Sequence, residues 1–185
     1  MRILALILAS AIAGSAQATG FPLNVGGPYS LTDQTGAART EAEPDGHFQL
    51  LFFGYANCEQ ICSAALPMMA DIVDGISDKA TVKPVMITVD PKQDTVENIG
   101  PALSVFHKDF VGLTGTDAEL QVAYDAFSVE KEVVFVDPSG QEIFSHGSFI
   151  YLLNAAGEVL TLVPPIMDVD QAVDIITPYV TGANG

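Results

Sequence analysis

The sequence predicts an α/β domain with a central mixed sheet flanked by helices. Two short, nearly continuous apolar runs, Phe48–Phe53 and Val82–Val89, are typical of strands buried on both faces. Between them, apolar residues from Ile61 to Ile76 recur at helical spacing. A strand, a helix and a second strand in this order imply a parallel pair joined by a right-handed crossover. We expect Ser63 to cap the helix, with Pro67 in its first turn.

The later elements complete a thioredoxin-like pattern. Helices are predicted after Thr116, which begins a capping box, and after Asp168; a weaker helix after Asp94 is interrupted at Gly100–Pro101. Strands are predicted at three apolar segments, the last two joined by a hairpin turn: Val133–Val136, Phe149–Leu153 and Val159–Val163. An early βαβ unit, a late hairpin and a closing helix together indicate a thioredoxin-like domain, with an N-terminal hairpin at 26–36 as a decoration.

The N-terminus resembles a secretory signal. Arg2 precedes an uncharged apolar run, and Ala16-Gln17-Ala18 has the small-x-small form of a signal-peptidase site. We therefore expect residues 1–18 to be a cleaved signal peptide, residues 19–185 a single exported domain, and the periplasm its compartment. An uncleaved segment that anchors the protein to the inner membrane is the alternative.

Charge and cysteine usage exclude several function classes. The 185-residue chain has a formal net charge of −16, which becomes −17 when Arg2 is removed with the leader. Such a surface repels nucleic acid, so we expect no nucleic-acid partner. The only two cysteines, Cys58 and Cys62, would close too small a loop to stabilise a domain as a disulfide. Their position in a turn that leads into a predicted helix N-terminus instead suggests a chemical role.

Four donor side chains are predicted to share one edge of the sheet. Cys58 and Cys62 follow the first predicted strand, and Asp90 follows the second. Ligands gather at the carboxyl ends of parallel strands. If the Phe149–Leu153 strand runs antiparallel to these, His146 lies at the same edge.

Two thiolates and one imidazole form a soft, three-ligand set. Thiolates favour Cu(I), and an imidazole makes Cu(II) tolerable, whereas structural zinc normally takes a fourth ligand. The other readings of Cys58 and Cys62 are an inert or structural pair and the redox disulfide of a thiol–disulfide oxidoreductase. Such oxidoreductases usually separate their cysteines by two residues and place a cis-proline where this chain has Ser145 and His146. Asp90 is either a turn former or an outer-sphere partner of the site.

The chain resembles the Sco/SenC copper chaperones. The resemblance runs from about residue 26 to 162 and includes "FFGYANCEQIC", "VMITVDPKQDT" and "SHGSFIYLLNAAGEV". It implies a thioredoxin-like fold and a copper site made by Cys58, Cys62 and His146. It also implies a function, the loading of copper into the dinuclear copper centre of cytochrome c oxidase subunit II.

Three positions depart from the family pattern. Glu59 and Ser63 stand where the family usually has proline after each cysteine, and Ser145 stands where it usually has aspartate before the histidine. None of these removes a ligand. Glu59 adds negative charge beside a thiolate, and the loss of aspartate at position 145 removes an outer-sphere partner for the imidazole.

We therefore predict a periplasmic copper metallochaperone rather than an enzyme, binding Cu(I), Cu(II) or both through Cys58, Cys62 and His146. Its expected partners are subunit II or another copper acceptor, a periplasmic copper donor and a thiol reductant. The alternative is a thiol–disulfide oxidoreductase that keeps the cysteines of the acceptor reduced. A copper-responsive signalling module is a third possibility.

Overall fold

The structure is a computed structural model that describes residues 24–56, 64–76 and 81–182. The predicted signal peptide, Cys58, Cys62, Glu59 and Ser63 lie outside the described residues. In the part that is described, no helix has the length and apolar character needed to cross a membrane.

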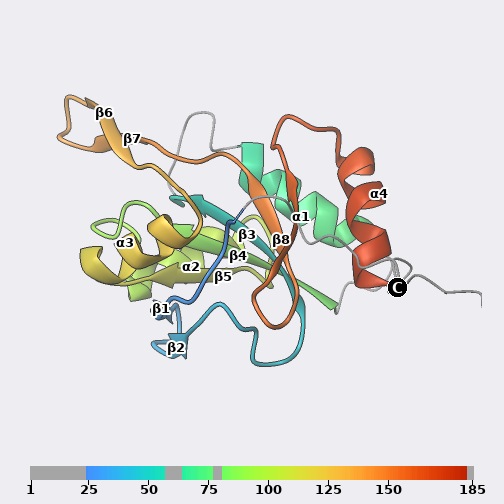
Figure 1. The fold of residues 1–185 in the computed structure, drawn as a ribbon. Helices are drawn as coiled ribbons and strands as arrows, with labels where there is room; N and C mark the ends of the chain where they lie inside the picture. Colours follow the sequence, from blue (N-terminus) through green and yellow to red (C-terminus); the bar gives the residue numbers. More distant parts are fainter. Residues whose placement is uncertain (1–23, 57–63, 77–80, 183–185) are drawn as a thin grey trace, which may run out of the picture.

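A seven-stranded mixed sheet forms the centre of the domain (Figure 1). Its order is β2-β1-β5-β4-β3-β8-β9. The three middle strands β5, β4 and β3 are parallel, and the strands on either side are antiparallel to their neighbours. The strands are β1 Leu31–Asp33, β2 Ala38–Arg39, β3 Phe48–Gly54, β4 Val82–Thr88, β5 Val111–Thr114, β8 Ile150–Leu153 and β9 Val159–Val163.

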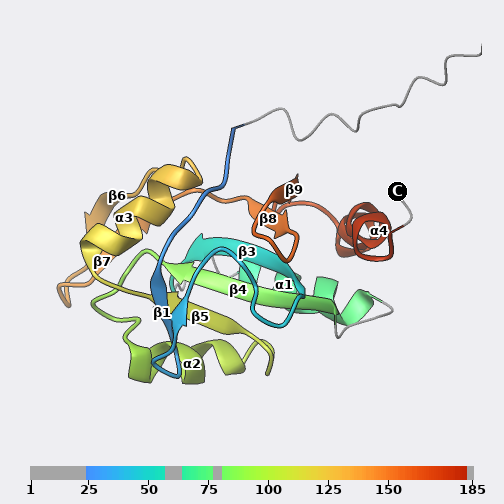
Figure 2. The same cartoon turned by 60° about the horizontal axis from the view of Figure 1, so that its bottom comes forward.

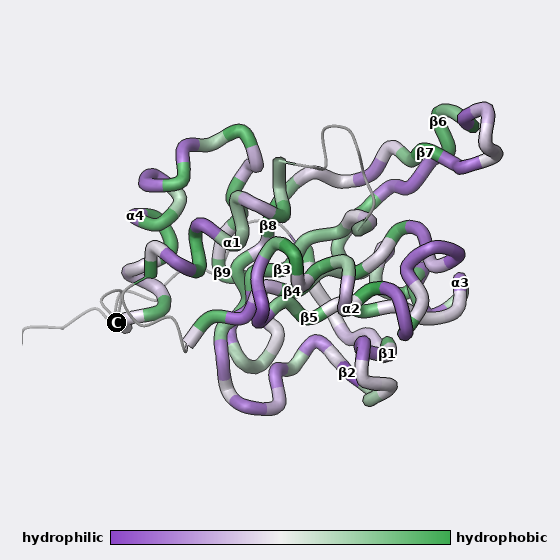
Figure 3. Tube along the Cα trace, turned by 180° about the vertical axis from the view of Figure 1, so that it is seen from behind, coloured by the Kyte–Doolittle hydropathy of each residue, from purple (hydrophilic) through white to green (hydrophobic). Residues whose placement is uncertain are grey.

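Strand β3 supplies the core on both faces of the sheet. Leu50 and Phe52 pack into one hydrophobic cluster, and Leu51 and Phe53 pack into the other. Successive side chains of a strand point to opposite faces, so a continuous apolar run is required when both faces are covered. The hydropathy of the chain accordingly runs high through the middle of the sheet (Figure 3).

Helices cover both faces (Figure 2). On one face the core includes residues of α1 (Ala65–Gly75), α2 (Val96–Ser104) and α4 (Val169–Val180). On the other face, α3 (Asp117–Ala126) packs with the chain segment before β1. The predicted α/β layering is confirmed.

The helix starts follow the sequence signals in two cases and differ in a third. Thr116 and Glu119 form the complete capping box, and Asp168 accepts a hydrogen bond from the backbone N–H of Asp170 at the start of α4. Helix α1, by contrast, has Ala64 and not Ser63 as its N-cap, without a side-chain hydrogen bond. Pro67 does lie in the first turn, where a missing N–H costs nothing.

Two further predictions were wrong. The N-terminal hairpin spans β1 and β2 rather than residues 26–36, and it joins the central sheet through β5 instead of decorating it. Helix α2 continues through Pro101. Ile99 and Leu103, on either side of the proline, are fully buried, and this burial offsets the hydrogen bond that the proline removes.

A second, two-stranded sheet projects from the domain (Figure 1). It consists of β6 (Glu132–Val136), which was predicted, and β7 (Glu142–Ser145), which was not. The turn between them is closed by a hydrogen bond from the Gly140 N–H to the Asp137 carbonyl. Strand β7 leads directly to His146.

Candidate functional site

The predicted edge of the sheet exists, and His146 lies at it. Strands β3 and β4 are parallel and end at the same edge, with Gly54 opposite Thr88. Strand β8 is antiparallel to β3, with Ile150 paired to Phe52, so β8 begins where β3 ends. His146 precedes Ile150 by four residues and therefore reaches the carboxyl edge, as the sequence predicted.

Aromatic rings at the end of β3 surround the imidazole. The ring centroid of His146 lies 5.7 Å from that of Phe52 and 6.0 Å from that of Tyr55, both edge to face. Along the chain, the segment that holds the two cysteines follows Ala56, two residues after β3 ends at Gly54, and precedes Ala64. The distance from His146 to either sulfur lies outside the described residues, so their convergence stays a prediction.

The surroundings of His146 favour the neutral imidazole that a metal ligand requires. Burial lowers the pKa of the imidazole, and this outweighs backbone hydrogen bonding at Gly147 and Phe53, which acts in the opposite sense. Its Nδ1 lies 2.9 Å from the Gly147 carbonyl oxygen. The lowered pKa favours the neutral imidazole, the form in which a ring nitrogen has a lone pair that can bind a metal.

Asp90 is buried beside the site at the end of β4. Burial raises the pKa of its carboxyl group, against hydrogen bonds from the backbone of Gln93 and Lys92. The Asp90 charge in turn contributes, after burial, to the raised pKa of Tyr55. Asp90 and His146 thus both interact with Tyr55, which the sequence analysis did not single out.

A second buried carboxylate, that of Asp94, holds the chain at the entrance to the cysteine segment. Asp94 is 1% exposed. Its carboxylate accepts hydrogen bonds from the Ala56 N–H at 3.1 Å and from the Thr88 hydroxyl at 2.7 Å. The Thr88 hydroxyl also accepts one from the Asp90 N–H. Asp94 therefore connects the end of β3, the end of β4 and the turn before α2.

We expect the substitution D94A to lower the free energy of unfolding by about 2–6 kcal/mol. It leaves two buried donors without an acceptor, and each such donor costs about 1–3 kcal/mol. D94N should lower the free energy of unfolding by less, because its amide oxygen can still accept one of these hydrogen bonds. Urea denaturation at pH 7 measures both variants, and unchanged stability of D94A would contradict the anchoring role.

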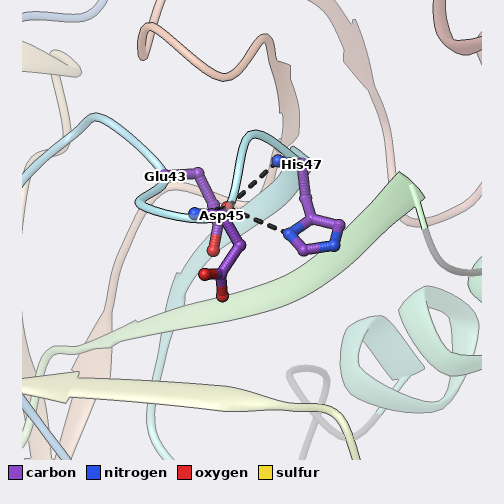
Figure 4. A group of neighbouring side chains, drawn as sticks. All are labelled: Glu43, Asp45 and His47. Carbon is purple, nitrogen blue, oxygen red and sulfur yellow. Dashed lines mark hydrogen bonds and ion pairs between the residues drawn. The ribbon is translucent and has the colours of Figure 1, made fainter.

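A separate group of donors lies before β3 (Figure 4). One ligand atom each of Glu43, Asp45 and His47 lies within 4.8 Å of the others, the only such group among the described residues. The Glu43 Oε2 atom, however, already accepts hydrogen bonds from the Asp45 N–H, the His47 N–H and the His47 ring, at 2.8, 3.0 and 3.0 Å. Its Oε1 faces Arg39 at 3.5 Å. We assign this group the structural role of closing the turn into β3.

The substitution E43Q is expected to lower stability at neutral pH by about 1–3 kcal/mol, the contribution of hydrogen bonds to a charged acceptor. Burial favours a higher pKa for Glu43, but the hydrogen bonds from His47 and Asp45 outweigh it and hold the pKa below its ordinary 4.5. The stabilisation is therefore fully present above pH 4.5 and is lost as the pH falls through the lower folded-state pKa. Urea denaturation of wild type and E43Q at pH 7 and pH 3 measures this. The difference between their free energies of unfolding should be smaller at pH 3.

The comparisons with known proteins identify the family of this chain. Residues 17–181 match the SCO1/SenC family. The chain belongs to this family. A SCO2-like protein of Rickettsia prowazekii is 34% identical over 140 residues, which cover 75% of this chain and 68% of the relative. The mitochondrial SCO1 homolog of Homo sapiens is 35% identical over 144 residues, covering 76% of this chain and 48% of that longer protein.

Solved structures of the family confirm the thioredoxin-like fold. Arabidopsis thaliana ScoI with copper bound is 28% identical and superposes with a TM-score of 0.78, covering 85% of this SCO1/SenC chain and 99% of its own. Bradyrhizobium japonicum ScoI with copper bound is 29% identical with a TM-score of 0.75, covering 84% and 99%. Both of these structures were determined with copper bound.

Two residues near the site had no individual signal in the sequence. Tyr55 and Asp94 belong to the segments "FFGYANCEQIC" and "VMITVDPKQDT", which carried the family resemblance. Asp90 could be singled out because it is a polar residue directly after a buried strand. Asp94 lies four residues further along the chain and has no such position. Its role depends on the Ala56 N–H, 38 positions away.

Proposed function

We propose that this protein is a copper metallochaperone that binds one copper ion through Cys58, Cys62 and His146. The observation that supports this best is the position of His146 at the carboxyl edge, against the end of the strand from which the cysteine segment departs. The copper-bound structures of two family members support the choice of metal.

The donor set suits an ion that must be passed on. The cysteines precede the N-terminus of α1, and a helix N-terminus lowers thiol pKa values. Two thiolates and a neutral imidazole would hold Cu(I) without a fixed fourth ligand. In transfer, acceptor ligands replace these three one at a time; copper keeps its oxidation state, and protons released by acceptor thiols return to Cys58 and Cys62.

We propose Asp90 as an outer-sphere residue. Asp90 acts on Tyr55 through its charge, and His146 contacts Tyr55 through its ring. Asp90 would therefore influence the site without a bond to the metal. The departures at Glu59, Ser63 and Ser145 bear on affinity and reduction potential and leave the three ligands in place.

For the acceptor we propose the dinuclear copper centre of cytochrome c oxidase subunit II, with a separate copper donor and thiol reductant. We further propose that residues 1–18 are removed on export, so that residues 19–185 act in the periplasm. The alternative of an uncleaved inner-membrane anchor predicts that the protein sediments with membranes. Edman sequencing and fractionation of the expressed full chain distinguish the two.

The decisive experiment is copper binding followed by transfer. Reduced protein is expected to take up one Cu(I) ion per chain in competition with a chromogenic chelator, and to pass it to the soluble copper-centre domain of subunit II. Binding of no copper, or of copper that reduced protein never releases to this domain, would overturn the proposal.

The alternative function, thiol–disulfide exchange with the acceptor, has its own support. The cysteine pair directly precedes α1 in a thioredoxin-like fold, the position where such a pair is redox-active. Exchange requires both thiols but not His146. The dependence on His146 therefore separates the two functions.

A further inference from the structure

The β6–β7 hairpin exposes an unusual amount of apolar surface. Four consecutive residues of β6 are solvent-exposed: Val133 at 44%, Val134 at 59%, Phe135 at 57% and Val136 at 51%. Because alternate side chains point to opposite faces, exposure of all four means that neither face of β6 is covered by the domain. We call these residues the apolar finger; β6 is the hydrophobic strand of the projecting hairpin in Figure 3.

The base of the hairpin is fixed to the edge of the sheet that holds His146. Phe144 of β7 packs edge-on against Tyr55, with ring centroids 5.9 Å apart. Lys92, in the turn after β4, donates a hydrogen bond to Glu142 of β7 at 2.7 Å. The Lys131 ammonium lies 4.5 Å from the centre of the Phe144 ring. The hairpin therefore contacts the rest of the domain at two points, Phe144 near its base and Glu142 near its turn, and these hold the finger in a defined position relative to the site.

The finger is also close to His146 along the chain. Phe135 pairs with Ile143, three residues before His146. At about 3.4 Å per residue, about 10 Å of extended chain leads from Ile143, the partner of Phe135, to His146. A protein bound to the apolar finger would therefore place part of its surface next to the imidazole of His146.

The charge around the finger indicates what kind of protein fits it. Residues 130–142 contain four carboxylates and one lysine, and the whole chain carries −16. A second copy would place finger against finger across a two-fold axis, with these carboxylates facing one another. Anionic lipid headgroups are repelled in the same way. A partner with an apolar patch surrounded by lysine and arginine side chains has the complementary surface.

We propose that the apolar finger is the docking element for the copper acceptor, and that it recognises an apolar patch with a basic rim on that protein. This rests on the proposed function. Four side chains bury less than a stable complex requires, so the contact is transient, as handing on an ion demands. Copper transfer then proceeds between the docked surfaces by the ligand exchange described above, with no change in oxidation state.

The test compares the double variant V134T/F135T with V105T. Threonine keeps the β-branched shape that suits a strand while removing apolar surface. Val105 is a matched control: it is 76% exposed and caps the end of α2, before the chain turns into β5. Each protein is loaded with Cu(I), and the rate of transfer to the soluble copper-centre domain of subunit II is measured by stopped flow.

The double variant is expected to bind copper with unchanged affinity and to transfer it about tenfold more slowly, as truncation of interface anchors does. V105T should transfer at the wild-type rate. The charge reversal E130K/E132K should also slow transfer, and raising ionic strength should reduce the difference between it and wild type.

The outcomes separate the two proposals. If wild type transfers copper and V134T/F135T transfers it at the same rate, the docking inference is overturned and the proposed function stands. If wild type transfers none, the proposed function falls, and the docking of this acceptor falls with it. A finger-dependent dimer in gel filtration, or finger-dependent binding to phosphatidylcholine–phosphatidylglycerol vesicles, would assign the finger to another occupant and also overturn the inference.

Discussion

Replacement of His146 by alanine is expected to lower copper affinity by more than about 100-fold. Loss of an outer-sphere partner of a metal ligand typically costs 10–100-fold, and loss of the ligand itself should cost more. The remaining two sulfur ligands would still bind Cu(I), so binding is weakened and not abolished. Competition titration with a Cu(I) chelator measures this directly.

The matched control is H47A. His47 belongs to the group with Glu43 and Asp45, but its ring hydrogen-bonds to Glu43 in the turn before β3, at the opposite end of that strand from Gly54. H47A should leave copper affinity unchanged. Thiol exchange of H146A with a model disulfide should also continue at the wild-type rate. If exchange collapses in H146A while copper affinity persists, the oxidoreductase function replaces the chaperone.

The substitution F127A should destabilise the fold by about 3–5 kcal/mol, the usual cost of truncating a buried phenylalanine. Phe127 follows α3 and is 0% exposed. Its ring packs against three others, with centroids 5.3 Å from Phe53, 5.2 Å from Tyr151 and 6.3 Å from Tyr29. The substitution would leave a cavity between α3 and the sheet that rigid strands fill poorly.

Urea denaturation of F127A and F149A provides the comparison. Phe149 is 45% exposed, so its truncation should cost at most about 1 kcal/mol. A similar decrease in the free energy of unfolding for F127A and F149A would contradict the role of Phe127 as the centre of this aromatic cluster. Because β3 supplies Phe53 to the cluster and Phe52 to the contact with His146, F127A should also weaken copper binding indirectly.

Some elements could be predicted because their signals are local. Thr116 and Glu119 form the capping box within four residues of chain, and Asn154 and Gly157 close the β8–β9 turn by a hydrogen bond. Because the residues of β3 are apolar without interruption, both faces of the sheet had to be covered at this strand, whatever its place in the strand order. The antiparallel direction of β8, which brings His146 to the carboxyl edge, followed from the fold that these elements implied.

Other elements depended on contacts that sequence patterns do not show. Strand β5 is only four residues long and has a glycine in its middle, Gly112, where a side chain would collide with Ile99 and Leu103 of α2. Strand β7 has no alternation of its own and forms because β6 pairs with it. Helix α2 continues past Pro101 because the core on both sides stabilises it.

By itself, the sequence determined the order of the principal elements, the strongly negative net charge, and the types of donor atom available for a metal. Those properties are set by residue chemistry and by interactions a few positions apart. Only the tertiary structure decided that His146 is half-buried among aromatic rings, that Asp94 accepts a hydrogen bond from the Ala56 N–H, and that both faces of β6 are exposed beside the site. These properties depend on which distant segments exclude water from one another, and that is settled only when the whole chain packs.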